Sequence, residues 1–290
     1  MFLIKNAKAN YLLFIGAGLF FCTLFLMSFF QAELLAVGYE SSRTKILDNF
    51  VLSFFLAIFI NPITEEFSFR AIFTKNRFLK LISCCGIPLF IIVSSNYYLL
   101  ILYVFFLIVL KFYSVNSLIL YITSSLIFAL AHYQLKDLFY LGEIVGLINH
   151  IGFSFVMIWI TLNFKFYKSV FTHALFNMAI MLPIFISLQF PDQTVQEIKQ
   201  NGVSIRWRKV PIFAESPNMQ MGGNFVDIRN YTLKEFQNIL HISKNKYVVV
   251  EGNNYYKFEV KIESSENSNL NEKQILVMLL KAKLIEKNYQ

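Results

Sequence analysis

The stretch "FVLSFFLAIFINPITEEFSFRAIF", residues 50 to 73, places three formal charges inside otherwise apolar sequence. A helix that crosses a bilayer needs about 20 mostly apolar residues, and this run is long enough. A charged side chain at the centre of a bilayer costs roughly 3 kcal/mol on insertion scales. We therefore expect Glu65, Glu66 and Arg70 to serve a purpose that offsets this cost.

Helical spacing separates the roles of these charges. Glu66 and Arg70 are i and i+4, so they lie on one face and can form an ion pair. Glu65 is rotated about 100° from Glu66 and has no such partner in the segment. Pro62 frees a backbone carbonyl near Ile58, and it either kinks the helix or starts a new one. In the alternative interpretation, both glutamates lie at a helix end among lipid headgroups, where a charged side chain costs little free energy.

The composition predicts a polytopic membrane protein. The chain of 290 residues is 56% hydrophobic and 15% charged, with a mean hydropathy of +0.54, whereas a soluble protein carries about 25% charged residues. Apolar runs occur at about 11–37, 48–73, 81–93, 97–113, 115–132, 138–163 and 169–190. We predict an all-α polytopic membrane helix bundle of about seven spans. Six is the alternative, because the third and fourth runs, which meet at "SSN", are short enough to form one broken element.

Positive charge in the short loops predicts the orientation. Lys and Arg in cytoplasmic loops set the topology of membrane proteins, so the net charge of +8 needs no nucleic-acid partner. The side that includes the N-terminus holds Lys5, Lys8, Lys75, Arg77, Lys80, Lys111, Lys165 and Lys168, and the other side holds Arg43, Lys45 and Lys136. We expect a cytoplasmic N-terminus and an extracytoplasmic C-terminal part. The Phe-, Asn- and Lys-rich composition hints at an AT-rich bacterial genome, so the expected location is a bacterial inner membrane.

The composition changes at Pro191, which predicts two domains, a transmembrane domain over 1–190 and a soluble extracytoplasmic one over 191–290. Thr232 with Glu235, and Asn271 with Gln274, have the spacing of capping boxes at two helix starts. Between these helices, "KYVVVEGNNYYKFEVKI" reads as a β-hairpin around Gly252-Asn253-Asn254. The second domain is therefore expected to be a small α/β unit.

Two further motifs place polar groups inside apolar runs. His132 ends the run "SLIFALAHYQ", with Phe128 one turn before it, and a lone histidine there is more often a packed or interfacial residue. His173 and Asn177 in "SVFTHALFNMAI" are i and i+4, so both point from one helix face into the bundle. Glu143, Asn149 and His150 share another run and either extend a site or form interhelical hydrogen bonds, the more frequent role.

Together these residue types could hydrolyse a peptide bond. A carboxylate can deprotonate a water molecule, and imidazoles can assist it or bind a metal ion that activates the water. An amide or an imidazole can donate to the oxyanion that develops during attack on a carbonyl. A reaction needs all of these groups near one point, and three motifs on separate helices can supply them.

At these residues the sequence resembles the CPBP family, the CAAX-protease and bacteriocin-processing intramembrane proteases. The family pattern appears here as Glu65-Glu66-x-x-x-Arg70, Phe128-x-x-x-His132 and His173-x-x-x-Asn177, and the resemblance covers residues 48–190. It implies that Glu65 activates the water and that Glu66 with Arg70 positions it. His132 would assist the water or bind metal, and His173 with Asn177 would bind metal or the oxyanion. A Zn²⁺ ion on His132, His173 and Glu65 is one implied mechanism, and a metal-independent one is the other.

The resemblance makes an intramembrane endopeptidase the leading hypothesis, with a peptide or membrane-protein substrate in the lipid bilayer. The C-terminal part also resembles an uncharacterised secreted domain of environmental bacteria, which favours an extracytoplasmic partner for residues 191–290. The alternative from another class is a non-catalytic membrane anchor or receptor that presents this domain. A transporter fits less well, because the charges lie near helix ends without repeat symmetry. A further alternative, the trimming of prenylated proteins, is less favoured because it requires a substrate class that bacteria mostly lack.

Overall fold

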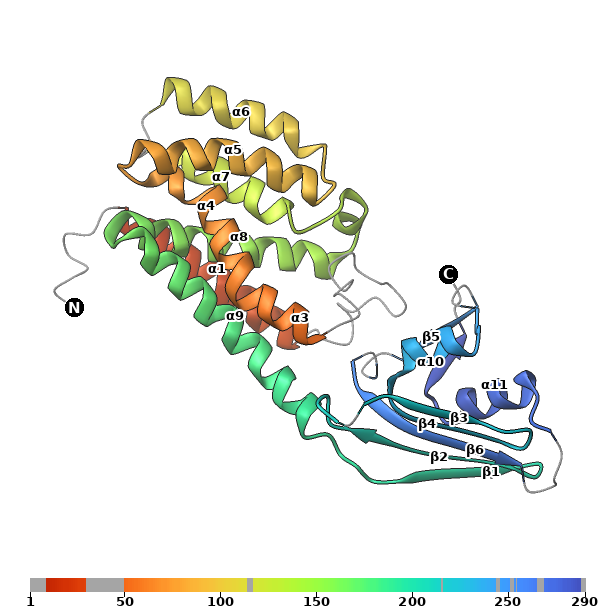
Figure 1. Cartoon of the computed structure of the whole chain (residues 1–290). Coiled ribbons are helices and arrows are strands. Elements are labelled where there is room, and N and C mark those ends of the chain that lie inside the picture. The colour runs from red at the N-terminus through yellow and green to blue at the C-terminus, as the bar shows by residue number, and fades with distance from the viewer. Residues whose placement is uncertain are drawn as a thin grey trace. The chain divides into compact units, whose positions relative to one another are not determined.

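The computed structural model describes residues 9–29, 50–113, 117–214, 216–243, 246–250, 253, 255–264 and 269–287. The chain divides into two compact units, residues 1–179 and 180–290 (Figure 1). The predicted apolar run at 11–37 is described only as far as residue 29. The loop cations Lys5, Lys8, Arg43 and Lys45 lie outside the described residues.

In its described residues, the first unit is built from helices (Figure 1). Their bounds are α1 Asn10–Phe29, α3 Phe50–Phe55, η2 Leu56–Ile60, α4 Asn61–Phe69, η3 Ala71–Phe73, α5 Arg77–Val93, α6 Leu99–Phe112, α7 Leu118–Leu130, η4 Leu135–Phe139, α8 Leu141–Asn163 and α9 Phe166–Gln189. The last residues of α9 belong to the second unit. The third and fourth apolar runs are two separate helices, α5 and α6.

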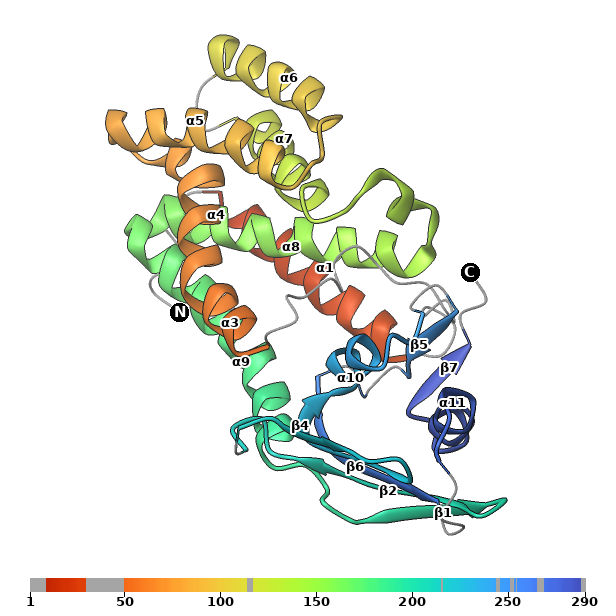
Figure 2. The ribbon, with the colours of Figure 1, turned by 45° about the vertical axis from the view of Figure 1, so that its right-hand side comes forward.

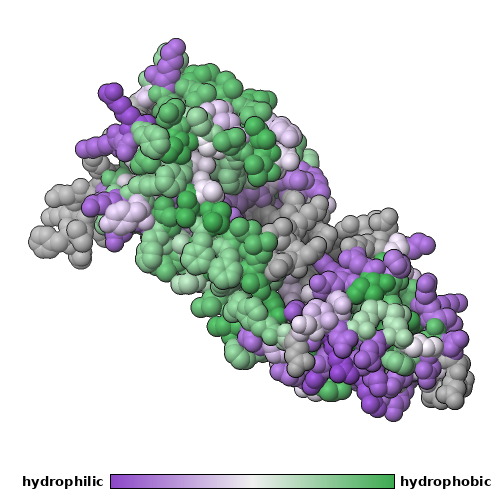
Figure 3. All heavy atoms as spheres, in the orientation of Figure 1, coloured by the Kyte–Doolittle hydropathy of each residue, from purple (hydrophilic) through white to green (hydrophobic). Residues whose placement is uncertain are grey.

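Three helices in the described residues are long and apolar enough to cross a membrane, namely Phe50–Phe69, Leu141–Asn163 and Phe166–Gln189. Shorter apolar helices cover Asn10–Leu26, Leu99–Phe112 and Leu118–Leu130. These lengths do not confirm about seven spans. The visible surface of the helices in Figure 3 is nevertheless mostly hydrophobic, as expected for a protein whose helices face lipid.

The helix Phe50–Phe69 is continuous but changes its winding in the middle. α3 and α4 are α-helical, whereas η2 between them is a π-helix that ends immediately before Asn61 and Pro62. Proline cannot donate a backbone hydrogen bond, and π-turns frequently occur where the α-helical register is disturbed. The predicted disturbance near Pro62 is therefore present as a π-turn.

Serine side chains fix the C-terminal end of α4. The last carbonyls of a helix lack intrahelical partners and need others when they are buried. Ser83 of α5 donates to the Ser68 carbonyl at 2.5 Å, and Ser124 of α7 donates to the Phe69 carbonyl at 3.1 Å. These two bonds hold the end of the glutamate-bearing helix against its neighbours.

Close backbone packing joins α1 to α8, which lie side by side in Figures 1 and 2. A Cβ atom added at Gly16 would lie 2.7 Å from the carbonyl oxygen of Gly152, so only glycine fits there. Asn149 of α8 donates to the hydroxyl of Thr23 at 2.8 Å. Polar pairing and glycine contact therefore fix the same helix pair.

The second unit contains a five-stranded antiparallel sheet in the order β1-β2-β6-β4-β3 and a two-stranded sheet of β5 and β7. The strands are β1 Gln196–Gln200, β2 Val203–Val210, β3 Asn218–Met221, β4 Phe225–Thr232, β5 Tyr247–Val249, β6 Lys257–Ser264 and β7 Ile285–Lys287; the helices are α10 Leu233–Ile239 and α11 Glu272–Lys281. One sheet face packs against these helices around Ile205, Ile262 and Leu279.

The predicted hairpin is wrong. β5 pairs with β7, and β6 instead pairs with β2 and β4 in the centre of the large sheet, where Phe258, Val260 and Ile262 are buried. Gly252 and Asn254 lie outside the described residues. A tight hairpin occurs instead between β1 and β2, where Asn201 and Gly202 have φ of 48° and 72°, as a type I′ turn requires.

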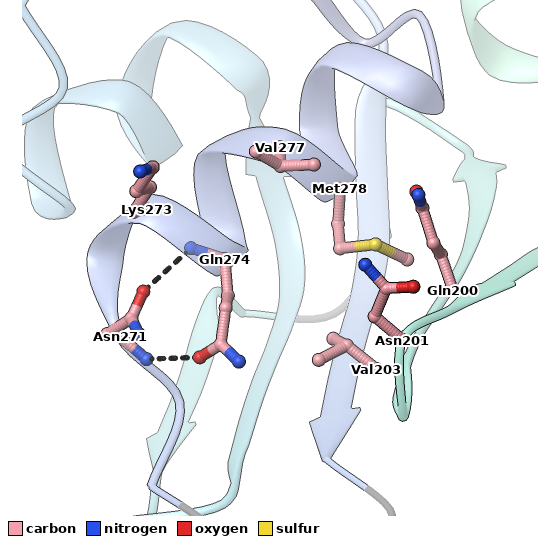
Figure 4. A pocket seen from close by; sticks show the side chains of 8 residues that line it. All are labelled: Gln200, Asn201, Val203, Asn271, Lys273, Gln274, Val277 and Met278. Carbon is pink, nitrogen blue, oxygen red and sulfur yellow. Dashed lines mark hydrogen bonds between the residues drawn. The ribbon is translucent and has the colours of Figure 1, made fainter.

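Both predicted capping boxes are confirmed. The Thr232 hydroxyl accepts the N–H of Glu235, whose carboxylate accepts the N–H of Thr232 at 2.8 Å. Asn271 and Gln274 make the same reciprocal pair at the start of α11 (Figure 4). Local side-chain chemistry therefore sets where both helices begin.

Candidate active site

Glu65 lies between two histidines from different helices. Its Oε1 is 3.7 Å from Nε2 of His132, at the end of α7, and its Oε2 is 3.6 Å from Nε2 of His173 on α9. These distances are too long for direct hydrogen bonds. The Glu65 side chain is 8% exposed and that of His132 is 22% exposed, so the cluster is reached from the His132 side.

The backbone fixes the proton position on His132. Its Nδ1 lies 2.8 Å from the carbonyl oxygen of Phe128, one turn earlier. A carbonyl oxygen only accepts, so Nδ1 carries the proton and donates it. The Nε2 of a neutral His132 therefore presents a lone pair toward Glu65.

A carboxylate fixes the proton position on His173 in the same way. Nδ1 of His173 lies 3.0 Å from Oε1 of Glu66, so it donates to that oxygen. Nε2 of His173 is left facing Glu65. Each histidine is thus oriented through Nδ1 and offers Nε2 to the same carboxylate.

Both oxygens of Glu66 have partners. Oε2 accepts the hydroxyl of Ser169, which lies on α9 one turn before His173. Oε1 also lies 3.6 Å from Nε of Arg70, so the predicted i, i+4 ion pair is confirmed. Glu66 and Arg70 are both fully buried. Because its oxygens are occupied, Glu66 holds other groups in place, and Glu65 is the carboxylate that remains able to act on a water molecule.

The Phe128 ring joins the first two motifs. The guanidinium carbon of Arg70 lies 3.9 Å from the ring centroid, a cation–π contact. The same ring packs edge-on against His132, with centroids 4.8 Å apart. Among the described residues, no hydrogen-bond partner is present for the three guanidinium nitrogens of Arg70, so Glu66 and this ring are its main electrostatic compensation.

His150 of α8 extends the cluster. Its ring centroid lies 4.7 Å from that of His132. Its Nδ1 is 2.8 Å from the Gly146 carbonyl and 3.1 Å from the Tyr133 hydroxyl. Of Glu143 and Asn149, the other two α8 residues considered as an extension of the site, Asn149 bonds to α1 away from this cluster.

The turn that carries His132 is held from the α5–α6 connection. The side-chain amide of Asn96 donates to the Ala131 carbonyl at 3.0 Å. The Tyr98 hydroxyl donates to the Tyr133 carbonyl at 2.9 Å. Two hydrogen bonds therefore flank His132 on the backbone and fix its position relative to Glu65.

Asn177 has a different environment from that of the other motif residues. Its Nδ2 donates to the carbonyl oxygen of Ala57, in the π-helical turn, at 2.7 Å. Ser169, His173 and Asn177 are spaced by four residues, so one stripe of α9 faces the helix Phe50–Phe69 along its length. Five predicted residues, Glu65, Glu66, Arg70, His132 and His173, form one connected cluster, and Asn177 contacts the same helix two turns earlier.

The resemblance also implied a Zn²⁺ ion on His132, His173 and Glu65. Within the described residues, no group of three or more His, Cys, Asp or Glu side chains is arranged to hold a metal ion. In the structure these three side chains are not arranged as a formed metal centre, and we derive no reaction step through one.

No sequence motif indicated Ser169, Asn96 or Tyr98. Ser169 could have been identified from its position four residues before His173, which places it on the same face of α9. Asn96 and Tyr98 could not, because their partners lie more than 30 residues away in the turn after α7.

The second unit has a pocket of its own between the β1–β2 turn and α11 (Figure 4). Its lining includes Gln200, Asn201, Lys273 and Met278, and no histidine, cysteine or carboxylate. Lys273 is the one ionisable side chain in this lining.

Residues 47–179 match the family model of the type II CAAX prenyl endopeptidase Rce1-like proteins. No curated protein and no solved structure matches the chain. The matched segment contains every residue of the cluster around Glu65 and also Asn177, and the apolar helices agree with an integral membrane location. The helical part of the chain is therefore similar, over residues 47–179, to the Rce1-like family of CAAX-type endopeptidases.

Proposed function

We propose that the cluster around Glu65 hydrolyses a peptide bond in a peptide or membrane-protein substrate. Glu65 takes a proton from a water molecule as the water oxygen forms a bond to the scissile carbonyl carbon. The negative charge that develops on the carbonyl oxygen is stabilised by donation from Nε2 of His173 in its imidazolium form, whose Nδ1 is held by Glu66. The proton held by Glu65 then passes to the leaving nitrogen as the C–N bond breaks.

The observation that carries this proposal is the arrangement of two imidazole nitrogens around one carboxylate. Nε2 of His132 and Nε2 of His173 lie 3.7 and 3.6 Å from the two oxygens of Glu65, and each ring is oriented through its Nδ1. A carboxylate in apolar surroundings raises the free energy of the folded protein, so such residues are usually retained for a function. His132, on the more exposed side, holds the water against Glu65.

Cleavage by the purified full-length chain in proteoliposomes tests the proposal. The probes are fluorescence-quenched peptides that end in a CAAX sequence, one set farnesylated and one unmodified, together with a transmembrane peptide. We expect cleavage of at least one set, and its loss in Glu65→Gln. A wild-type protein that cleaves no set, or a Glu65→Gln variant as active as wild type, contradicts the proposal. The set that is cleaved identifies the substrate class.

The Zn²⁺ ion stays a prediction of the resemblance. Metal analysis of the purified protein, with activity measured before and after chelation, tests it. Activity that is lost on chelation and restored by Zn²⁺ supports metal chemistry at His132, His173 and Glu65. Activity that survives removal of bound metal supports the glutamate and histidine mechanism.

The finer topology is also proposed. Seven membrane helices, with the N-terminus in the cytoplasm, would place residues 191–290 outside a bacterial inner membrane, as the distribution of Lys and Arg favours. Reporter fusions after Gln189 test this: a periplasmic signal supports it, and a cytoplasmic signal contradicts it.

A second function is suggested by the separate core of the C-terminal unit. Its sheet and two helices enclose apolar side chains without any from the first unit, and its other sheet face carries charged residues such as Arg206, Lys261 and Glu263. It could bind an extracytoplasmic partner, and in the non-catalytic alternative this would be the protein's whole role. Full biological function in Glu65→Ala cells would favour that alternative over the endopeptidase.

A further inference from the structure

The π-turn in the helix Phe50–Phe69 leaves one carbonyl without a partner in its own register. The N–H of Asn61 bonds to the carbonyl of Leu56, five residues earlier. In this register, the carbonyl of Ala57 would accept from residue 62. That residue is Pro62, which has no N–H. An unpaired carbonyl is costly in apolar surroundings, where water does not replace the lost partner.

Asn177 supplies the missing donor. Its Nδ2 lies 2.7 Å from the Ala57 carbonyl oxygen, although the two residues are 120 positions apart in sequence. The bond joins α9 to the π-turn, and the same stripe of α9 bonds to Glu66 through Ser169 and His173. α9 therefore contacts the helix Phe50–Phe69 both at the π-turn and at the glutamates.

The register of this turn sets the direction of Glu65. A π-turn adds one residue relative to an α-helix, and each residue of an α-helix turns the chain by about 100°. If the turn relaxed to α-helical winding while the helix start stayed in place, Glu65 would rotate away from the two histidines by about that angle. Any group that stabilises the π-turn therefore helps to keep Glu65 between His132 and His173.

We propose that Asn177 is a positioning residue: it pairs the Ala57 carbonyl that Pro62 leaves unpaired, and it thereby holds the π-turn that directs Glu65. This role differs from donation to the oxyanion, which the resemblance implied. It rests on the proposed function only in taking Glu65 as the base. The hydrogen bond and the winding that it maintains are properties of the fold that can be measured without substrate.

Four full-length proteins in nanodiscs test the proposal: wild type, Asn177→Ala, Pro62→Ala and the double variant. Hydrogen–deuterium exchange of the amides of residues 56–66 is measured by mass spectrometry, alongside kcat and KM on the cleaved probe. Asn177→Ala is expected to speed exchange in this segment by about tenfold, as loss of one hydrogen bond allows. It also lowers kcat with little change in KM.

Pro62→Ala restores an N–H at position 62, so the Ala57 carbonyl no longer depends on Asn177. We therefore expect the double variant to exchange and cleave like Pro62→Ala alone. Asn163→Ala is the matched control, because the Asn163 amide donates to the Trp159 carbonyl of its own helix at 2.9 Å. It should leave exchange in residues 56–66 unchanged.

Unchanged exchange of residues 56–66 in Asn177→Ala overturns the proposal, whatever happens to cleavage. So does a double variant whose kcat stays lower than that of an active Pro62→Ala protein, since an oxyanion donor cannot be replaced by an N–H at position 62. If Pro62→Ala is itself inactive, the proposal is judged by the exchange rates of residues 56–66 in the four proteins. Absence of cleavage by wild type would contradict the proposed function and leave the exchange result valid.

Discussion

Nδ1 of His173 lies 3.0 Å from Oε1 of Glu66, the glutamate next to the proposed base. Ser169 donates to the other oxygen of Glu66, and Arg70 lies 3.6 Å from the first. Glu65, in contrast, directs both oxygens toward Nε2 atoms. The two adjacent glutamates therefore have different environments: Glu66 holds other side chains of the site in place, and Glu65 is the proposed base.

This difference predicts that replacing glutamate by glutamine lowers mainly the activity at position 65 and the stability at position 66. Glu65→Gln should lower kcat by about 10²- to 10⁴-fold, the usual contribution of a general base, and leave the unfolding temperature near that of wild type. Glu66→Gln leaves the buried Arg70 without its counter-charge, which costs about 3–5 kcal/mol, so this variant should unfold at a lower temperature.

Cleavage assays and thermal unfolding in detergent measure the two effects on the same preparations. Equal loss of stability in both variants would show that Glu65 is also a structural residue. Full activity of Glu65→Gln would remove it from the mechanism.

Ser169→Ala should destabilise the site through Glu66. A hydrogen bond to a buried charged group contributes about 1.5–3 kcal/mol, so we expect a lower unfolding temperature and a reduced kcat. The matched control is Ser187→Ala on the same helix, because Ser187 is exposed and its hydroxyl bonds only locally, to the Ile184 carbonyl. The prediction fails if the two variants have the same unfolding temperature and activity.

The Glu66–Arg70 pair and the shared face of His173 and Asn177 were predictable because both depend on helical spacing. An i, i+4 separation brings Glu66 to Arg70 and places His173 and Asn177 on one face, whatever the rest of the fold. The contact of Arg70 with the Phe128 ring and that of Asn177 with the Ala57 carbonyl depend on how helices cross and on a π-turn. Periodicity carries no information on either.

The C-terminal unit shows the same limit. The capping boxes at Thr232 and Asn271 involve residues three apart, and both were predicted. Strand pairing is non-local: β6 follows β5 in sequence but pairs with β2 and β4. The Asn201-Gly202 pair is a local signal for the two-residue β1–β2 turn, but it carries no information on which strands flank β2 and β6.

Phe128→Leu should weaken both contacts of the Phe128 ring. The guanidinium of Arg70 loses its aromatic partner, an interaction of about 2 kcal/mol when desolvated, and His132 loses its edge contact. We expect a lower unfolding temperature and a lower kcat. Phe139→Leu is the control, because Phe139 is 85% exposed. Wild-type stability of Phe128→Leu would contradict a structural role for the cation–π contact.

Gly16→Ala should separate α1 from α8. The new Cβ would lie 2.7 Å from the Gly152 carbonyl oxygen, a backbone atom that cannot move aside alone, and such overpacking costs about 1–3 kcal/mol. Gly18→Ala on the same helix is the matched control, since nothing lies within 4 Å of its added Cβ. Thermal unfolding should distinguish them, and equal unfolding temperatures would rule out close α1–α8 contact at Gly16.

Hydrolysis in water enriched in ¹⁸O tests the central claim most directly. Wild-type protein in proteoliposomes is given the peptide probe, and the new C-terminal carboxylate is examined by mass spectrometry. Wild type is expected to yield a product that carries one ¹⁸O atom from the attacking water, whereas Glu65→Gln, folded as judged by its unfolding temperature, should form this product about 10²- to 10⁴-fold more slowly. Labelled product formed by Glu65→Gln at the wild-type rate would contradict the account.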